Sequence, residues 1–334
     1  MARRGEFDLI ADLFSPLASS IPGALGLTDD AAILDLPAGC ELVTTVDAMV
    51  EDVHFYPADA ANLVAQKLLR VNLSDLAAMG AKPLGYLLTL VRPATTSESW
   101  LQRFAHGLAA DQRTFGIGLC GGDTVSTAGP LVLSLTALGH VAKGQALRRQ
   151  GAMPGDILYV SGTIGDAGLG LELVRNNDTH DTSGDLTGLS RAETNELVAR
   201  LQCPEPRLAL GQALVGIATS AVDISDGLIG DLEHIALVSC VGLELDLSAI
   251  PASDAAVRVI GNKETAKLKL LTGGEDYELA FTAPASETKT ISDISRKLNL
   301  ALTPIGKVVS GGSVDVKGKD GTLLPVINRG FSHF

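Results

Sequence analysis

The first half of the chain alternates between two spacings of hydrophobic residues. Residues 41–47 (ELVTTVD) alternate and are rich in Val and Thr, a pattern that predicts a strand ending at Asp47. Residues 60–83 instead repeat apolar positions at a helical period, and Gly80 and Pro83 are typical of a helix end. The same reasoning predicts a strand over 83–91, a helix over 97–116 and a strand over 130–141.

Gly, Pro and basic residues interrupt this pattern over 143–156 and predict a domain junction there. We therefore expect an α/β chain with an N-terminal domain over 1–145 and a C-terminal domain over 150–334. The polar segment at about 175–190 has no apolar period, so we expect it to form a flexible surface loop. The remaining predicted elements are strands over 157–162, 220–225 and 243–247, helices over 166–174, 206–216 and 227–239, and a final group that ends with 302–309.

The composition fits two domains with sizeable cores, because 46% of the 334 residues are hydrophobic and only 19% are charged. These values exclude a disordered chain. The net charge is −13, whereas nucleic acids and anionic membranes are bound by clustered Lys and Arg. We therefore expect neither nucleic acid nor a membrane as a partner.

The cysteines and the N-terminal segment indicate a cytoplasmic location. No C-x-x-C pair occurs among the four cysteines, so the sequence predicts reduced, buried thiols without a zinc site or a disulfide framework. Glu6, Asp8 and Asp12 interrupt the apolar pattern of the N-terminus, which therefore lacks the core of a signal peptide.

Acidic residues recur where the pattern predicts that a strand ends in a turn. They are Asp29 and Asp30, Asp47, Asp123, Asp223 and Asp226, and Glu275 and Asp276. Any one of them can be explained as a cap, but capping does not explain their repeated occurrence beside small residues. Oxygen ligands without a Cys or His cluster favour Mg²⁺. Because Mg²⁺ takes only one or two carboxylates and completes its shell with water and phosphate, the pattern predicts several ions around a polyphosphate.

Residues 221–232 (AVDISDGLIGDL) place three of the chain's carboxylates in one short apolar segment. Two like charges about 4 Å apart repel by roughly 4 kcal/mol at an effective dielectric constant near 20. We therefore expect a cation beside Asp223 and Asp226. Asp231 lies further along the predicted helix, and we expect it on the exposed face.

Several further residues could take part in such a site. Asp75 lies in the middle of a predicted helix among apolar neighbours, although a solvated position would also explain it. Thr44 and Thr45 could add oxygen ligands, or could reflect strand propensity alone. His54 could be a packed loop residue. The guanidinium of Arg149 matches phosphate oxygens, although an ordinary surface charge is an equal alternative.

The common nucleotide-binding motifs are absent from the sequence. It contains no G-x-x-x-x-G-K-[ST] loop and no H-R-D or D-F-G motif. Residues 161–170 (SGTIGDAGLG) could direct backbone N–H groups at an anion, although such loops are common. The residues alone therefore predict a Mg²⁺-dependent polyphosphate site without naming a substrate.

Motifs spread from Gly5 to Phe334 resemble those of the bacterial thiamine-monophosphate kinase family. They are GEFDLI, DDAAIL, TTVDAMVEDVHF, NLSDLAAMGAKP, GGDTV, MPGDILYVSGTIGD, DISDGLIGDL, LTGGEDYELAF and GFSHF. The resemblance implies a two-domain aminoimidazole-ribonucleotide synthetase-like fold whose N-terminal sheets pair in a homodimer. It also implies direct transfer of the ATP γ-phosphoryl group to thiamine monophosphate, with several Mg²⁺ ions and no side-chain nucleophile.

The resemblance also implies a role for individual residues. The implied Mg²⁺ ligands are Asp30, Thr44, Thr45, Asp47, Asp75, Asp123, Asp223 and Asp226. The positions implied to contact ATP are Gly122, Asp123, Arg149 and Ser225. Those implied to hold thiamine monophosphate are His54, Glu275 and Phe331.

The chain departs from the family pattern at three positions. Thr28 and Asp52 stand where the family usually has Gly, and Phe331 stands where it often has Trp or Tyr. The alternatives are another ATP-dependent enzyme of the superfamily and a non-catalytic nucleotide or divalent-ion sensor. The chain lacks the reactive N-terminal or C-terminal Cys that two of these enzymes would use.

Overall fold

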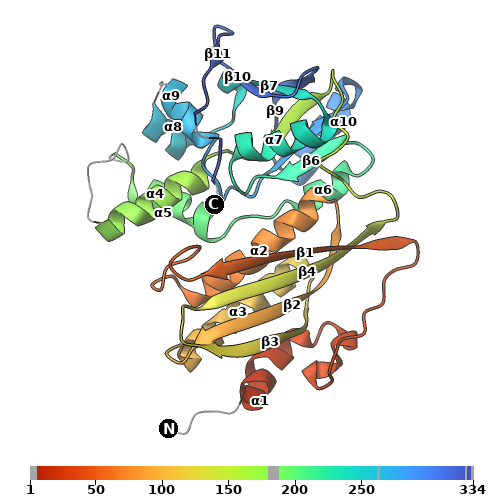
Figure 1. The fold of residues 1–334 in the computed structure, drawn as a ribbon, viewed down its shortest axis with the longest axis vertical. Helices are drawn as coiled ribbons and strands as arrows, with labels where there is room; N and C mark the ends of the chain where they lie inside the picture. Colours follow the sequence, from red (N-terminus) through yellow and green to blue (C-terminus); the bar gives the residue numbers. More distant parts are fainter. Residues whose placement is uncertain (1–5, 180–187, 262–263, 328, 332–334) are drawn as a thin grey trace. The chain divides into compact units, whose positions relative to one another are not determined.

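The chain divides into two compact units in a computed structural model that describes residues 6–179, 188–261, 264–327 and 329–331. Unit 1 comprises Met1–Leu76 and Ala81–Gln145, and unit 2 comprises Ala77–Gly80 and Ala146–Phe334. Figure 1 shows their helices and strands.

Unit 1 is a four-stranded sheet with helices packed on one face. Short helices precede it, namely α1 (Glu6–Leu9), η1 (Ile10–Phe14), η2 (Ser15–Ala18) and η3 (Pro22–Leu27). The sheet and its helices are β1 (Cys40–Val50), α2 (Ala61–Ala78), β2 (Lys82–Pro93), α3 (Glu98–Phe115), β3 (Leu119–Thr127) and β4 (Val132–Ala142). The strand order is β1-β4-β2-β3, with β2 and β3 parallel and the other pairs antiparallel.

The two faces of the unit 1 sheet differ in chemistry. Alternate residues of β1 point to opposite faces. Thr45 and Asp47 bond residues of α2, so they lie on the helix-covered face. Leu42 and Val46 lie on the other face, where they are 53% and 60% exposed. This open face therefore carries apolar side chains that the unit itself does not cover.

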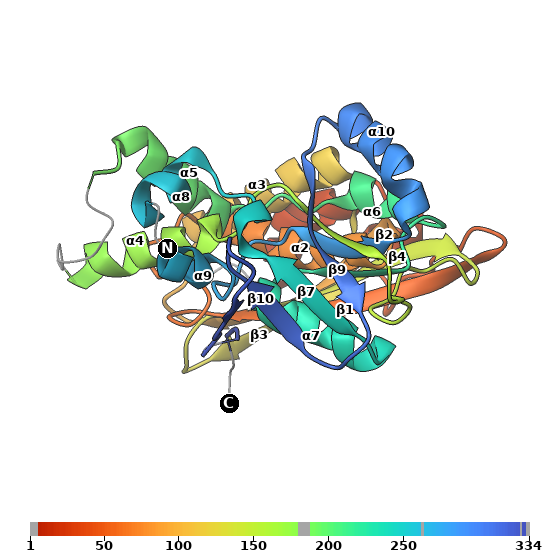
Figure 2. The same cartoon turned by 90° about the horizontal axis from the view of Figure 1, so that it is seen from above.

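Unit 2 is built on a seven-stranded mixed sheet of order β11-β10-β7-β9-β5-β8-β6. Its strands are β5 (Ile157–Ser161), β6 (Ser220–Asp223), β7 (Gly242–Asp246), β8 (Leu279–Ala283), β9 (Leu302–Val309), β10 (Val314–Lys317) and β11 (Leu323–Leu324). Its helices are α4 (Asp166–Thr179), α5 (Arg191–Gln202), α6 (Leu208–Leu214), α7 (Leu228–Ser239), α8 (Asp254–Ile260), α9 (Glu264–Leu270), α10 (Thr288–Leu298), η4 (Leu247–Ala249) and η5 (Ala285–Glu287). Helices α4 and α5 lie side by side, and α10 packs against β9 (Figures 1 and 2).

The core of unit 2 explains why α7 is held firmly. Leu228, Ile229, Leu232 and Ile235 of this helix are fully buried in the main apolar cluster, together with strand residues of the sheet. Burying a side chain of this size stabilises the fold by roughly 1.5–3 kcal/mol. Helix α7 is therefore a rigid support for the residues at its N-terminus.

The structure differs from the sequence prediction in several elements. Strand β1 continues past Asp47 to Val50, and β3 was not predicted because two glycines and an edge position obscure its alternation. Helix α4 extends through Thr179, so the start of the predicted loop over 175–190 is helical. The centre of that loop, 180–187, lies outside the described residues.

Within the described ranges, no helix combines the length and the apolar character that crossing a bilayer requires.

A buried ion pair joins helices α2 and α3 of unit 1. Arg70 Nε lies 2.7 Å from Asp111 Oδ2, and Gln66 donates to Asp111 Oδ1 at 2.9 Å. Asp111 is only 1% exposed. We expect Asp111→Ala to lower the free energy of unfolding by about 3 kcal/mol, because the largely buried guanidinium of Arg70 loses this carboxylate.

Urea denaturation measures this loss. The exposed Asp35 of the same unit is the matched control, and its replacement by Ala should change stability by less than about 0.5 kcal/mol. Equal effects of the two substitutions would contradict a stabilising role for the buried pair.

Candidate functional site

Strand β6 delivers two acidic residues to the turn that precedes α7. Asp223 is the last residue of the strand and is 4% exposed, whereas Ser225 and Asp226 lie in the turn and are half-buried. The turn passes into the helix through Gly227, whose φ of 121° favours glycine. The predicted placement of Asp223 and Asp226 at a strand end is confirmed.

Asp231 is buried, and the prediction that it lies on an exposed helix face is wrong. It is 2% exposed, and its Oδ2 accepts hydrogen bonds from Ser225 N at 3.0 Å and Asp226 N at 3.1 Å. The helical period alone did not reveal this, because a polar residue among apolar ones is ordinarily solvated. Asp231 instead satisfies backbone donors of the turn.

Burial raises the pKa of Asp231 to about 7, and repulsion from Asp226 acts in the same direction. The two backbone N–H groups and the positive charge of Arg149 oppose this rise. Arg149 is exposed, and the electrostatic effect of its positive charge reaches Asp231. The predicted ATP-contacting residues Arg149 and Ser225 both belong to unit 2.

Glu275 lies against the same turn. Glu275 N donates to Ser225 O at 2.7 Å, and Tyr277 N donates to Ile224 O at 2.8 Å. Ile224 N in turn donates to Glu278 O at 2.9 Å. Glu275 and Tyr277 have φ values of 73° and 49°, which non-glycine residues rarely adopt, so the backbone bonds hold a strained segment in place.

Phe331 closes the other side of the turn. Its backbone N–H donates to Asp226 O at 2.9 Å, and the residue is 57% exposed. The ring borders a cavity of about 550 Å³ in unit 2 whose walls include five glycines. These are Gly165, Gly168, Gly273, Gly274 and Gly330. The final residues of the GFSHF motif, 332–334, lie outside the described residues.

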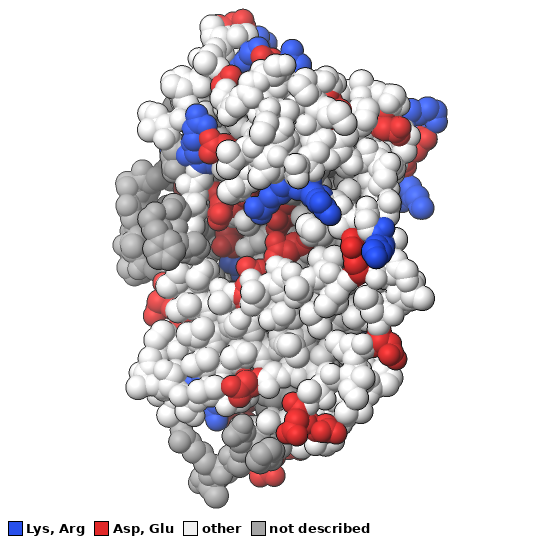
Figure 3. Space-filling model, turned by 45° about the vertical axis from the view of Figure 1, so that its right-hand side comes forward, with Lys and Arg blue, Asp and Glu red and all other residues white. Residues whose placement is uncertain are grey.

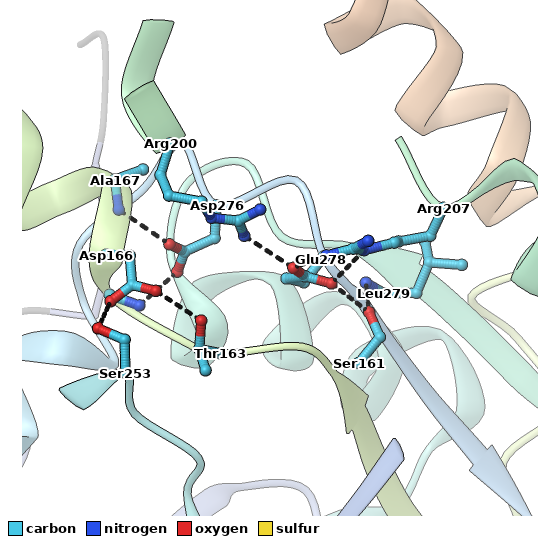
Figure 4. Close-up of polar contacts among 11 residues, drawn as sticks. Ser161, Thr163, Asp166, Ala167, Arg200, Arg207, Ser253, Asp276, Glu278 and Leu279 are labelled. Atoms are coloured by element: carbon cyan, nitrogen blue, oxygen red, sulfur yellow. Dashed lines mark hydrogen bonds and ion pairs between the residues drawn. The ribbon is translucent and has the colours of Figure 1, made fainter. Parts of the chain in front are cut away.

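The glycine-rich loop after β5 binds a carboxyl group that belongs to the chain itself. Gly165 N donates to Asp276 Oδ2 at 2.8 Å, and Ala167 N donates to Asp276 Oδ1 at 3.3 Å (Figure 4). These N–H groups at the start of α4 therefore serve a buried carboxylate. The suggestion that this loop binds phosphate through them is wrong.

Asp276 follows a turn and precedes β8, so the expectation that it marks a strand end is also wrong. It is 1% exposed, and this burial raises its pKa to about 8. The two N–H groups and the charge of Arg200 lower the pKa, but they do not outweigh the loss of water. Asp276 anchors the segment that carries Glu275.

Glu278 forms a second buried anchor that sequence reasoning missed. Arg207 contacts both of its carboxylate oxygens, through Nε at 2.7 Å and Nη2 at 2.5 Å. Arg200 adds a bond at 2.7 Å, and the Ser161 hydroxyl donates at 2.5 Å (Figure 4). The sequence feature that could have revealed this anchor is a Glu placed directly before an entirely buried strand, where only a paired charge is tolerated.

In unit 1, β1 and α2 bring several predicted ligands together. Thr45 Oγ1 donates to Asp75 Oδ2 at 2.5 Å, and Asp47 N donates to the side-chain oxygen of Asn72 at 3.2 Å. Asp75 is half-buried and faces the sheet, so it is not a freely solvated helix position. Asp47 lies within β1 and not at the strand end that the sequence predicted.

Thr44 does not share the face of Thr45 and Asp47. Successive residues of a strand point in opposite directions, so the Thr44 hydroxyl lies on the open face of the sheet with Leu42 and Val46. Its side chain therefore does not join Thr45 and Asp47 as a ligand. Only its backbone carbonyl remains available for that role.

Asp30 and Asp123 border a cavity of about 650 Å³ in unit 1, together with Gly122. Asp123 lies within β3, and Asp30 lies in a bend after η3, so neither follows the end of a strand. Thr28 has a φ of −111°, a value open to any residue, so it causes no backbone strain beside Asp30.

His54 is held next to the end of β1. Its Nδ1 accepts a hydrogen bond from Val50 N at 3.1 Å, and its carbonyl accepts one from Lys67 Nζ at 3.3 Å. Asp52 has a φ of 67°, in the left-handed region that favours glycine. The loop therefore keeps the conformation that Gly would allow, and Asp tolerates it better than most residues.

The acidic residues do not form a ready metal cage. In the part of the chain that the structure describes, no three His, Cys, Asp or Glu side chains lie together as a group able to hold a metal ion. The predicted ligands Asp223 and Asp226 belong to unit 2, and the others belong to unit 1. An all-oxygen donor set with few carboxylates in one place fits Mg²⁺, which keeps water and phosphate ligands.

One face of the molecule carries few charged side chains. On the face drawn in Figure 3, neutral residues predominate among those described, and the basic side chains occur in small separate groups.

Comparison with known proteins defines the class of protein. Residues 28–141 match the family model of the AIR synthase related protein, N-terminal domain, and residues 153–319 match that of the C-terminal domain. The chain is therefore a two-domain AIR synthase related protein.

Full-length relatives define the family more narrowly. The thiamine-monophosphate kinase of Caulobacter vibrioides is 41% identical over 322 residues, which are 95% of this chain and 88% of that protein. The crystal structure of thiamine-monophosphate kinase from Stenotrophomonas maltophilia K279a is 40% identical with a TM-score of 0.82, and the match covers 94% and 98% of the two chains. The structure of AaThiL complexed with AMPPCP and TMP is 29% identical with a TM-score of 0.77, and the match covers 100% and 99%. The chain belongs to the thiamine-monophosphate kinase family.

The buried carboxyl of Asp276 predicts a pH dependence of stability. Because its pKa is about 8 in the folded protein and about 4 in an unfolded chain, it favours folding below about pH 4. This contribution is lost as the pH rises to about 8. The unfolding free energy should therefore decrease from pH 5 to pH 8. We expect this decrease to be smaller by roughly 1 kcal/mol or more in Asp276→Asn than in the wild-type protein.

Urea denaturation at a series of pH values measures the slope. We compare the change of unfolding free energy with pH and not its absolute value. Asn cannot accept both N–H bonds, so the absolute stability of the variant also changes. An identical slope in the wild-type protein and in the variant would show that Asp276 ionises normally.

Proposed function

We propose that the chain transfers the γ-phosphoryl group of ATP to the phosphate of thiamine monophosphate, giving thiamine diphosphate and ADP. The observation that carries this proposal is the likeness to thiamine-monophosphate kinases, which extends over 95% of the chain and includes both domains. The AaThiL complex with AMPPCP and TMP, which aligns with the whole chain, supports ATP as the co-substrate.

The chemistry requires positioning and charge neutralisation more than covalent catalysis. The acceptor is itself a phosphate, so no strong base is needed to activate it. Two anions must approach each other, and holding them in line supplies much of the rate enhancement. We therefore propose that no side chain acts as a nucleophile.

We propose that the Mg²⁺ ligands are the residues that the family resemblance implies. The ligands are Asp30, Thr45, Asp47, Asp75 and Asp123 in unit 1, the Thr44 carbonyl, and Asp223 and Asp226 in unit 2. When bound, the metal neutralises charge on the phosphates. The support is the chemistry of the donor set, together with the contact between Thr45 and Asp75.

We assign ATP contacts to Gly122, Asp123, Arg149 and Ser225, and contacts with thiamine monophosphate to His54, Glu275 and Phe331. In unit 2 this assignment is supported by the backbone bonds that join the turn to Glu275 and Phe331. Nucleotide-binding and acceptor-binding residues thus share one backbone framework there.

We also propose that two copies pair through the open face of the unit 1 sheet, and that the protein acts in the cytoplasm. The exposed Leu42 and Val46 of β1 support the pairing, because apolar groups of this size gain stability when a partner covers them. The use of ATP supports the location.

The enzymatic proposal is tested by incubating the protein with Mg-ATP and thiamine monophosphate and separating the products by chromatography. We expect thiamine diphosphate and ADP in equal amounts. Asp226→Asn should reduce turnover by roughly 100-fold or more, because a charge that stabilises the transition state is removed. Its melting temperature should remain close to that of the wild-type protein.

Asp293→Asn on α10 is the matched control, since that residue forms surface ion pairs with Lys289 and Arg296 of its own helix. It should retain full turnover. A folded, Mg²⁺-saturated protein that binds nucleotide without making product would instead indicate a sensor, and product from another acceptor would indicate a different enzyme of the superfamily.

A further inference from the structure

We propose that Asp231 is a positioning residue, whose buried carboxylate fixes the backbone that presents Ser225 and Asp226 to the nucleotide and its metal. This inference rests on the proposed function of that turn. It assigns to Asp231 a role distinct from metal ligation.

The carboxylate of Asp231 reaches back from α7 to the turn that precedes the helix. Helix α7 begins after Gly227, which has no side chain to accept a hydrogen bond from the first turn. Asp231 lies one turn inside the helix, and a single oxygen of its carboxylate reaches back to Ser225 N and Asp226 N. The turn before the helix is thereby tied to a helix whose apolar face is fully buried.

The carbonyls of the same turn are held from the opposite side. Ile224 O, Ser225 O and Asp226 O accept hydrogen bonds from Tyr277 N, Glu275 N and Phe331 N at 2.8, 2.7 and 2.9 Å. Each of the three consecutive peptide groups therefore has at least one fixed polar atom. The peptide between Ser225 and Asp226 is held at both ends.

This arrangement fixes the direction of the Asp226 side chain. The peptide groups on both sides of its Cα are immobilised, so only the side-chain torsions remain. Without Asp231, the amides of Ser225 and Asp226 would have to turn toward another acceptor, and such a rotation would swing the Asp226 carboxylate. Displacements of this size at a reacting site have large effects on positioning.

The arrangement also predicts which substrate is affected. Besides its bond to Ser225 O, Glu275 has an anchor outside the turn, because Asp276 beside it bonds Gly165 and Ala167 at the start of α4. A disturbed turn should therefore weaken nucleotide and metal binding more than acceptor binding. A purely structural role for Asp231 would lower stability without this selectivity.

Three variants test the proposal. Asp231→Leu removes the acceptor, Asp231→Ser leaves a hydroxyl too short to reach both amides, and Asp231→Asn keeps an oxygen at the same position. The control is Asp156→Asn, because Asp156 is also buried in unit 2 and accepts bonds from Met153 N and Thr219 Oγ1, which lie outside the turn. Binding of Mg-AMPPCP is measured by calorimetry, and KM is measured separately for ATP and for thiamine monophosphate.

We expect Asp231→Leu to weaken Mg-AMPPCP binding and raise the KM for ATP by about tenfold or more, with the KM for thiamine monophosphate changed by less than about threefold. Asp231→Ser should show the same selectivity and serves alone if the Leu variant does not fold. Asp231→Asn should stay within about threefold of the wild-type protein. Asp156→Asn should lower the melting temperature only.

Unchanged nucleotide binding in a destabilised Asp231→Leu or Asp231→Ser protein would overturn the proposal. Equal losses in the Asn and Leu variants would also overturn it, since they would show that the charge of Asp231 matters and not its acceptor oxygen. The calorimetric measurement requires no turnover. If the wild-type protein binds Mg-AMPPCP but makes no thiamine diphosphate, the proposed function fails while the positioning role is still decided.

Discussion

One buried carboxylate organises the end of β6. Asp231 is removed from water and accepts two backbone N–H bonds, which tie the turn at 224–227 to α7, a helix that packs in the main apolar core of unit 2. Removing a carboxylate from water is costly unless charged or hydrogen-bonded partners compensate. Here the amides and the nearby Arg149 provide that compensation, and the raised pKa of Asp231 shows that it is incomplete.

The cost of removing a carboxylate from water also separates the acidic residues around this turn into two groups. Asp231, Asp276 and Glu278 are buried and build the framework, through backbone amides in the first two cases and paired arginines in the third. Asp226 and Glu275 are carried by that framework. The strained φ values of Glu275 and Tyr277 are tolerated because the side chain that follows each of them, Asp276 or Glu278, is anchored.

Periodicity predicted most strands and helices of unit 1, and ordered motifs predicted the family, because both depend on residues close together in the sequence. Whether a carboxylate is buried, and which groups it bonds, depends instead on residues that are distant in the sequence. Asp231 was predicted to be exposed because its acceptor role depends on how the turn folds back on α7. Asp276 binds the glycine-rich loop at Gly165 from more than a hundred residues away, so no local pattern could reveal that the loop holds a carboxyl group of the chain itself.

The claim that Asp231 pins the turn is tested most directly by amide hydrogen exchange of the wild-type protein, followed by NMR. Both bonded amides, Ser225 N and Asp226 N, should exchange at least about 100-fold more slowly than the exposed loop amides of residues 311–312. Exchange of the Ser225 and Asp226 amides at the rate of that exposed loop would contradict the account.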